Sequence, residues 1–206
     1  DADYDRYLWI VEVLKRGQYR VEVIYDHLPF RVKDVIFSAL LVSANESLIR
    51  IGTLAGADLE DLDIIEEWIL RGRRGLAANW DDDRRRCFDT DLISGRFIEV
   101  ETIAMLAPVL AGQVTPPVRM AAKQLWYSDS MINAPDMRWP LPPTTSLTAD
   151  EFNPTRYWRG PVWPVVNWLL WYAWDRIGEF DIAAELRSFA LEQIQATGFY
   201  EYMNPI

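Results

Sequence analysis

Two stretches near the C-terminal end of the sequence carry residue types that could bind a ligand and transfer a proton. The first, residues 152–168, reads FNPTRYWRGPVWPVVNW and sets aromatic rings and a guanidinium beside prolines that stiffen the backbone. Sugars have apolar C–H faces and many hydroxyl groups, so rings next to fixed polar groups suit both kinds of surface. We predict a binding role for the residues around the turn and a packing role for the deeper tryptophans. The binding residues are Tyr157, Trp158, Arg159, Gly160 and Trp163, and the packing residues are Trp168, Trp171 and Trp174.

The second stretch, residues 197–205, reads TGFYEYMNP and sets one carboxylate among aromatic rings just after a predicted helix. From composition alone, two interpretations of Glu201 stay open. It is either a solvated loop residue or a carboxylate in partly apolar surroundings, which raise the pKa of a carboxyl group and suit it to proton transfer. The second interpretation would make Glu201 a catalytic residue.

Other titratable residues are interpreted as structural. Asp81–Asp83 precede three arginines and predict a solvated turn. Glu46 lies on a predicted buried helix, where it either hydrogen-bonds within the core or lines the floor of a pocket. His27, interpreted as a loop residue, is the only histidine and Cys87 is the only cysteine. These counts exclude a multi-histidine metal site, a disulfide framework and a Cys-rich zinc site.

Hydrophobic periodicity predicts a mainly helical chain. Amphipathic helices are expected at 3–16, 59–77, 116–127 and 180–196, helices that are apolar almost all round at 31–55 and 161–178, and a mixed helix at 101–111. A helix without a polar face is buried on several sides. Residues 79–99 break the pattern and predict a small hairpin with strands at 87–88 and 96–98. The connection over residues 128–160 holds five prolines, and a loop of this length inside a domain is usually functional.

Surface and buried helices alternate along the chain, which is the pattern of helical hairpins packed in two layers. Such hairpins either close into a toroid or stack into an open α-solenoid. The sequence contains no repeat of fixed period that would favour the solenoid. Both alternatives are all-α folds.

The composition is that of a folded, water-soluble protein. Hydrophobic residues make up 50% of the 206 residues and charged residues 25%, and the net charge is −10. An acidic chain without a basic cluster indicates neither nucleic acid nor an anionic membrane as a partner. The longest apolar run, residues 163–174, is shorter than the ~20 residues of a membrane span, and no signal peptide opens the chain. We expect a cytoplasmic protein, and the ends, without an initiator Met, look cut.

The two stretches with predicted chemistry, residues 152–168 and 197–205, resemble the C-terminal part of glycoside hydrolase family 63. The resemblance is carried by YWRGPVWP with NW in residues 157–168, which is the most specific element, and by GFYEYMNP in residues 198–205. The nearest branch is that of the bacterial mannosylglycerate and glucosylglycerate hydrolases, to which DYDRY at 3–7 and FSALL at 37–41 are also similar. The resemblance therefore extends over nearly the whole chain.

The resemblance implies an (α/α)6 barrel that hydrolyses, with inversion, an α-glycosidic bond in a small glucoside or mannoside such as glucosylglycerate or mannosylglycerate. Inverting enzymes use two carboxyl groups, one to protonate the leaving oxygen and one to deprotonate water, and we expect neither metal nor cofactor. Glu201 matches the family's general base. The residues that match the lining of its sugar pocket are Tyr157, Trp158 and Trp163. The family's general acid, an aspartate in a Gly-x-Asp-Asn-Ser-Pro type motif, has no counterpart in these residues.

Length leads to the same interpretation. A ring of twelve helices with their loops needs about 400 residues, so the seven helices expected here form a little more than half of one. We interpret residues 1–206 as the C-terminal part of a catalytic domain whose missing N-terminal half supplies the general acid and part of the pocket, which leaves this chain inactive by itself. The alternatives are a debranching-type α-glucosidase or trehalase relative, and a non-catalytic helical carbohydrate-binding or scaffold module.

Overall fold

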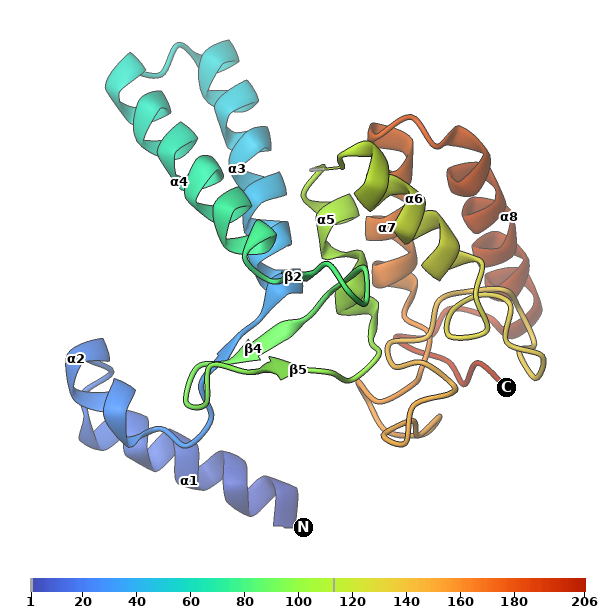
Figure 1. Cartoon of the computed structure of the whole chain (residues 1–206), viewed down its shortest axis with the longest axis horizontal. Helices are drawn as coiled ribbons and strands as arrows, with labels where there is room; N and C mark the ends of the chain where they lie inside the picture. Colours follow the sequence, from blue (N-terminus) through green and yellow to red (C-terminus); the bar gives the residue numbers. More distant parts are fainter. Residues whose placement is uncertain (1, 113) are drawn as a thin grey trace. The chain divides into compact units, whose positions relative to one another are not determined.

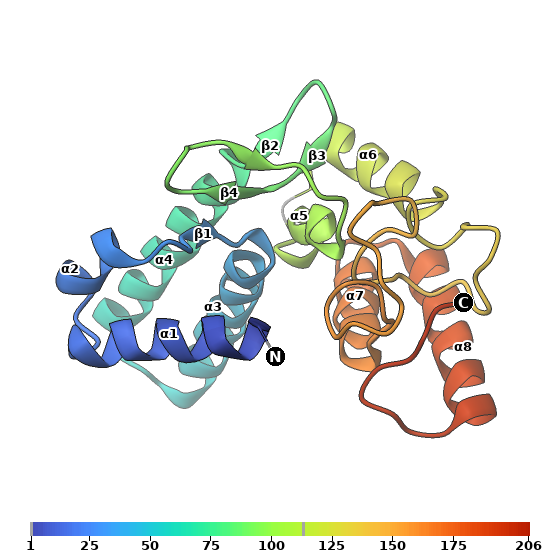
Figure 2. The same cartoon turned by 90° about the horizontal axis from the view of Figure 1, so that it is seen from below.

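The computed structural model describes residues 2–112 and 114–206, which form two compact units. The first unit comprises the chain up to Lys33 together with Thr90–Phe97, and the second comprises Asp34–Asp89 and Ile98–Ile206. Figures 1 and 2 show them in two views. All residues with predicted chemistry lie in the second unit.

The first unit is a helix followed by a short connection to a strand. It contains α1 (Ala2–Arg16), α2 (Val21–Ile24), the 3-10 helix η1 (Tyr25–His27) and β1 (Val32–Lys33). Gly17 follows the end of α1 as predicted, and a Cβ at this position would collide with the Ile24 side chain. His27 is exposed at the end of η1, within the connection where it was predicted.

Three helical hairpins make up the second unit. They are α3 (Val35–Ala55) with α4 (Leu59–Ala77), the 3-10 helix η2 (Ile103–Leu106) and α5 (Ala107–Leu110) with α6 (Pro116–Trp126), and α7 (Pro164–Arg176) with α8 (Phe180–Thr197). In both views the two helices of each long hairpin, α3/α4 and α7/α8, run side by side (Figures 1 and 2). α5 contacts both α3 and α7, so the first helices of the three hairpins form one connected layer.

Each of the seven predicted helical segments is present, and three of them begin later than expected. The segment predicted at 101–111 begins as the 3-10 helix η2 at Ile103 and continues as α5. α3 begins at Val35 rather than at residue 31, because Asp34 is its N-cap and accepts a hydrogen bond from the Phe37 N–H at 2.9 Å. α7 begins at Pro164 rather than at residue 161, since Val162 instead pairs with Met203 in an isolated β-bridge.

The segment between α4 and η2 contains two strand pairings in place of the single predicted hairpin. β2 (Trp80–Asp81) pairs with β3 (Arg86–Cys87), and β4 (Asp89–Asp91) lies between β1 and β5 (Phe97–Ile98) in a three-stranded sheet. The sequence prediction correctly located strands near 87–88 and 96–98, but their mutual pairing is wrong. The reason is the turn at Asp81, which accepts the Arg84 N–H at 2.8 Å and folds β3 back onto β2.

The prediction that α3 is buried on several sides is wrong for this chain. One face of the helix is buried, but Phe37 is 71% and Leu41 61% exposed on the other. α7 differs in a similar way. Trp174 is fully buried as predicted and Trp171 is half-buried, whereas Trp168, which was expected to pack, is 58% exposed. Both helices therefore keep an apolar face that the described residues do not cover.

By length and composition, α3 would also qualify as a membrane-spanning helix, and it is the one helix among the described residues that does. Core helices of soluble proteins pass the same test. The middle of α3 carries Glu46, which pairs with two arginines of neighbouring helices.

A salt-bridge network centred on Glu46 joins the three hairpins. Its two carboxylate oxygens accept from Arg73 Nη2 on α4 at 2.5 Å and from Arg176 Nη1 on α7 at 2.6 Å. Arg176 also donates through Nη2 to the carbonyl oxygen of Leu110, the last residue of α5, at 2.7 Å. The side chains of Glu46 and Arg176 are only 23% and 20% exposed, so solvent screens the pair little. Glu46 thus fits both roles left open by the sequence, because it hydrogen-bonds between helices and also lines two cavities.

Replacing Arg176 by Met should lower the free energy of unfolding by about 2–4 kcal/mol, because it leaves a shielded carboxylate and a helix-end carbonyl without their partner. The measurement is urea denaturation followed by tryptophan fluorescence. Arg71→Met, at an exposed position of α4, is the matched control and should change stability by less than about 0.5 kcal/mol. Equal losses in the two variants would show that the network does not hold the hairpins together.

Candidate active site

The turn over residues 157–163 and the C-terminal loop over residues 199–205 lie side by side. Val162 and Met203 exchange two backbone hydrogen bonds, each 2.9 Å long, in an antiparallel bridge. A further bond joins the Arg138 N–H to the carbonyl oxygen of Pro205 at 2.9 Å. The fold thus brings together the two stretches in which the sequence predicts chemistry.

A hydrogen bond between Tyr157 and Glu201 lies at the centre of this pairing. Tyr157 Oη donates to Oε1 of Glu201 at 2.8 Å, across 44 positions of sequence. This bond is the main cause that raises the pKa of the Tyr157 hydroxyl, with partial desolvation second, since ionising the phenol would put two negative charges in contact. Tyr157 therefore keeps its proton at neutral pH and remains a donor. The other oxygen, Oε2, has no hydrogen-bond partner among the described residues.

The surroundings of Glu201 in this chain are open to solvent. Glu201 itself is exposed, and its neighbours Phe199 and Tyr200 are 87% and 61% exposed, so their rings do not enclose the carboxylate. Of the two interpretations left open by composition, the solvated loop is the one that describes these residues.

Four aromatic rings form a platform beside the carboxylate. Trp158 and Trp163 stack with ring centroids 4.0 Å apart and planes inclined by 5°. Tyr202 stacks on Trp163 at 5.2 Å, and Tyr157 meets the same ring edge-on at 4.6 Å. Trp163 is 4% exposed and its indole N–H donates to the Tyr157 carbonyl oxygen at 3.0 Å. Because Trp158 is 50% exposed, the platform offers a fixed apolar surface of the kind that the C–H face of a sugar stacks on.

The turn that carries these rings requires glycine at position 160. A Cβ on Gly160 would lie 2.7 Å from the Phe152 ring. Its N–H donates to Thr144 Oγ1 at 3.1 Å, and Thr145 Oγ1 donates to the Trp158 carbonyl oxygen at 3.2 Å. Both threonines are buried in the long connection over residues 128–160. That connection therefore holds the turn in place.

Only some of the six predicted site residues have their side chains gathered at one place. Tyr157, Trp158 and Trp163 are gathered next to Glu201. Gly160 is buried beneath the turn and contributes through its backbone. The Arg159 side chain is exposed, and its carbonyl oxygen accepts the Asn153 N–H at 2.6 Å, which closes the loop before the turn.

Sequence reasoning missed three residues that shape the site. The Tyr202 ring centroid lies 5.3 Å from that of Tyr157, and its place in the aromatic GFYEYMNP stretch could have indicated this. Thr144 and Thr145 carry no such signal, because side chains that bond to a distant backbone follow no local pattern.

The other carboxylates singled out in the sequence are structural. Asp81 accepts hydrogen bonds from the backbone and the guanidinium of Arg84, and the backbone bond is the main cause that lowers its pKa. Glu46 is held by arginines. In residues 2–112 and 114–206, no three His, Cys, Asp or Glu side chains gather into a group that could hold a metal ion. Of the carboxylates singled out in the sequence, Glu201 is the one beside the aromatic platform.

Known proteins are similar to this chain in both sequence and fold. A family model for the mannosylglycerate hydrolase MGH1-like glycoside hydrolase domain matches residues 1–206. The chain is similar to a mannosylglycerate hydrolase of Thermus thermophilus (38% identity, 99% of this chain, 47% of the relative). It is also similar to a glucosylglycerate hydrolase of Mycolicibacterium hassiacum (35% identity, 100% of this chain, 46% of the relative). A crystal structure of a glycoside hydrolase family 63 mannosylglycerate hydrolase from Thermus thermophilus in complex with glucose matches with a TM-score of 0.89 and 36% identity, over 100% of this chain and 50% of that one.

These likenesses confirm the predicted helical-barrel fold class and favour the toroid over the solenoid. The chain spans about half the length of the curated relatives it matches.

Replacing Gly160 by Ala should destabilise the chain by about 2–3 kcal/mol, because the new Cβ collides with the Phe152 ring and strains the backbone. The shift of the turn should also weaken the near-ultraviolet circular dichroism of the stacked Trp158 and Trp163. Gly178→Ala is the control: its φ is +83° but its Cβ would meet nothing within 4 Å, so only the backbone cost of about 1 kcal/mol applies. An unchanged spectrum and a loss equal to the control's would refute the steric account.

Proposed function

The chain belongs to the family of mannosylglycerate hydrolase MGH1-like glycoside hydrolase domains, and from this we propose that it is part of an inverting hydrolase that acts on a small α-glucoside or α-mannoside. The substrate class is that of glucosylglycerate and mannosylglycerate. The observation that carries the proposal is the 2.8 Å bond between Tyr157 and Glu201 next to the platform of Trp158 and Trp163. Since the chain spans about half the length of its relatives, we also propose an N-terminal half that supplies the rest of the active site.

Glu201 acts as the general base in this proposal. In an inverting reaction a carboxylate takes a proton from water while that water attacks the anomeric carbon from the side opposite the leaving group. The Tyr157 hydroxyl supports this role because its hydrogen bond holds the carboxylate in one orientation. Oε1 accepts that bond, so Oε2 is the oxygen that receives the proton from water.

The aromatic platform holds the sugar at the right distance from the base. Tyr157 meets the Trp158 ring edge-on with centroids 6.0 Å apart, and the same tyrosine is bonded to Glu201. Platform and base therefore form one connected unit. A sugar stacked on Trp158 loses its freedom relative to the carboxylate, which lowers the entropic part of the barrier.

The general acid comes from the second half of the domain. Glu46 is held in ion pairs with two arginines, and hydrogen bonds from Arg84 lower the pKa of Asp81, whereas a general acid has to be free to approach the leaving oxygen in its protonated form. In inverting glycosidases the acid and the base stand about 6.5–9.5 Å apart, with room for water and substrate between them. An acid on a facing half would meet this requirement opposite the exposed Glu201.

An apolar stripe on α3 supports the presence of such a half. Exposed apolar residues recur along the helix at intervals of four and three positions, at Phe37, Leu41, Ala44, Leu48 and Ile51. This spacing forms a seam along one side of a helix and is typical of packing against a second helix. The stripe lies on the side of α3 opposite Glu46, so the core of this chain does not use it.

In the full-length protein, Glu201→Gln should lower kcat for the hydrolysis of glucosylglycerate or mannosylglycerate by about 10²–10⁴-fold, with a smaller effect on KM, because the amide cannot accept the proton of water. The measurement is steady-state release of glycerate from both substrates. Glu67→Gln, at an exposed position on α4, is the control. A kcat near that of the wild type would remove Glu201 from the mechanism.

A second variant, Tyr157→Phe, tests the role of the hydroxyl. The carboxylate then loses the hydrogen bond that holds Oε1, so Oε2 is no longer fixed toward the water, while the phenyl ring keeps its edge contact with Trp163. Steady-state kinetics should show a fall in kcat of about tenfold or more with a smaller change in KM. A higher KM with an unchanged kcat would show that the tyrosine acts in sugar binding alone.

A further inference from the structure

The loop that carries Glu201 is not held by backbone hydrogen bonds of its own. It leaves the end of α8 at Gly198, and within the described part of the chain no backbone N–H or carbonyl group of residues 199–202 takes part in a hydrogen bond. Backbone bonding resumes at Met203, which pairs with Val162. A segment without backbone bonds keeps one conformation only where its side chains hold it.

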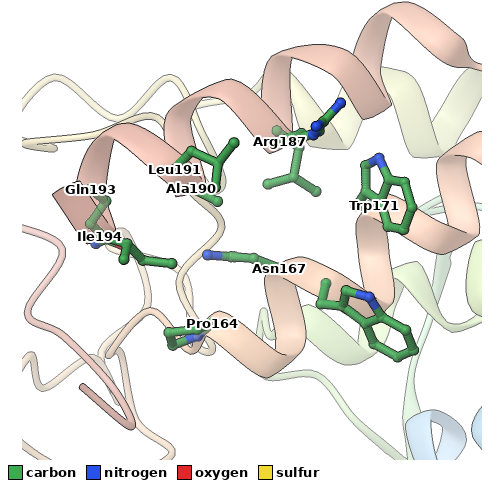
Figure 3. A pocket seen from close by; sticks show the side chains of 10 residues that line it. Pro164, Asn167, Trp171, Arg187, Ala190, Leu191, Gln193 and Ile194 are labelled. Atoms are coloured by element: carbon green, nitrogen blue, oxygen red, sulfur yellow. The ribbon is translucent and has the colours of Figure 1, made fainter. Parts of the chain in front are cut away.

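The helix ends next to this loop do not fix it by packing alone. α8 ends at Thr197 and α7 begins at Pro164, directly after Trp163. A groove of about 240 Å³ lies between the two helices, and its lining includes Pro164 and Ile194, a residue of the last turn of α8 (Figure 3). The distance between the base loop and the aromatic platform therefore depends on contacts that the loop itself makes.

The Tyr202 side chain makes such a contact. Its ring stacks on Trp163 with centroids 5.2 Å apart, and it meets the Tyr157 ring edge-on at 5.3 Å. Trp163 is 4% exposed and is therefore a fixed surface to stack on. The other two rings of the loop, Phe199 and Tyr200, are 87% and 61% exposed. Within the described part of the chain, Tyr202 is the one ring of this loop that contacts the platform.

Tyr202 also completes the surroundings that orient Tyr157. The rings of Trp158, Trp163 and Tyr202 are inclined to the Tyr157 ring by 85°, 82° and 88°, which is the favourable edge-to-face arrangement. The phenol cannot turn without losing these contacts, so its hydroxyl stays directed at Glu201. This matters because Tyr157 is 49% exposed and Glu201 is exposed as well, so water competes for the hydrogen bond between them.

We propose that Tyr202 is a positioning residue for the general base. Its ring acts on Glu201 in two ways, by anchoring the loop backbone to Trp163 and by keeping Tyr157 in the orientation that holds Oε1. The inference rests on the proposed function, since it assigns a role in the same reaction. A base displaced by about an ångström still faces a bound sugar but no longer meets the attacking water, so the rate suffers more than binding does.

Steady-state kinetics of the full-length protein test this role. Tyr202→Leu keeps an apolar side chain but loses both ring contacts, and it should lower kcat about tenfold or more while KM changes by less than about threefold. Tyr202→Phe keeps the ring and should retain kcat within about twofold. Tyr127→Leu is the control, because Tyr127 is 40% exposed and its hydroxyl bonds to Glu185, away from the platform. It should leave both constants unchanged.

A double variant shows whether Tyr202 acts together with Tyr157. Tyr157→Phe removes the hydroxyl that Tyr202 helps to orient, so the two substitutions affect the same hydrogen bond. Tyr157→Phe combined with Tyr202→Leu should therefore lower kcat by clearly less than the product of the two single effects. A loss equal to that product would show that the two tyrosines act independently and would overturn the proposed coupling.

Other results would also overturn the proposal. A kcat of Tyr202→Leu within twofold of the wild type would mean that the ring does not position the base. A rise in KM alone would make Tyr202 part of the sugar-binding surface, and an equal loss in Tyr202→Phe would assign the effect to the hydroxyl. If Tyr202→Leu does not fold, Tyr202→Met is measured in the same way. Failure of the proposed function looks different, because Glu201→Gln itself would then keep its kcat.

Discussion

The ion pair between Glu46 and Arg176 is the contact on which the arrangement of the second unit depends. It joins α3 to α7 across 130 positions of sequence, and the same guanidinium holds the carbonyl oxygen at the end of α5. A helix leaves its last carbonyls unsatisfied, so a cation placed there stabilises both the helix end and its position. Gly112 is part of this arrangement, because a Cβ at that position would lie 2.5 Å from Arg176 Nη2. One side chain thus fixes three helices of the same layer.

The two ends of α7 make different kinds of contact. α7 has 13 residues and is therefore about 20 Å long, with Arg176 at one end and the turn of Trp163 at the other. That turn is neither helix nor strand, and its course is set in part by hydrogen bonds: Thr144 Oγ1 accepts from the Gly160 N–H and donates to the Pro161 carbonyl oxygen, and Thr145 Oγ1 donates to the Trp158 carbonyl oxygen. Loops on a rigid scaffold can take the strained or close-packed conformations that binding requires, and Gly160 against Phe152 is such a conformation. Stability and function are thus placed at different ends of the same helix.

The predictability of each feature follows from how local its cause is. The helices could be predicted because periodicity and caps act within one or two turns, and Glu46 could be predicted because a carboxylate on an apolar helix needs a partner. The strand pairing could not be predicted. Cys87 pairs with Trp80 because Asp81 accepts the Arg84 N–H and closes a turn between the two strands. The clustering of Tyr157 with Glu201 followed from resemblance and not from spacing, because 44 positions separate them. The prediction that α3 is buried on several sides was wrong because an apolar face shows only that the helix needs a partner there. The pattern does not show that the partner belongs to this chain.

Two features of the surface have a common explanation in the proposed second half. The carboxylate of Glu201 is exposed, and α3 keeps an apolar stripe that the described residues do not cover. Desolvation strengthens the interaction of a carboxylate with its substrate, and a helical seam buries apolar area. A half that covered the stripe and enclosed Glu201 would account for both features, whereas two separate partners would have to coincide to do the same.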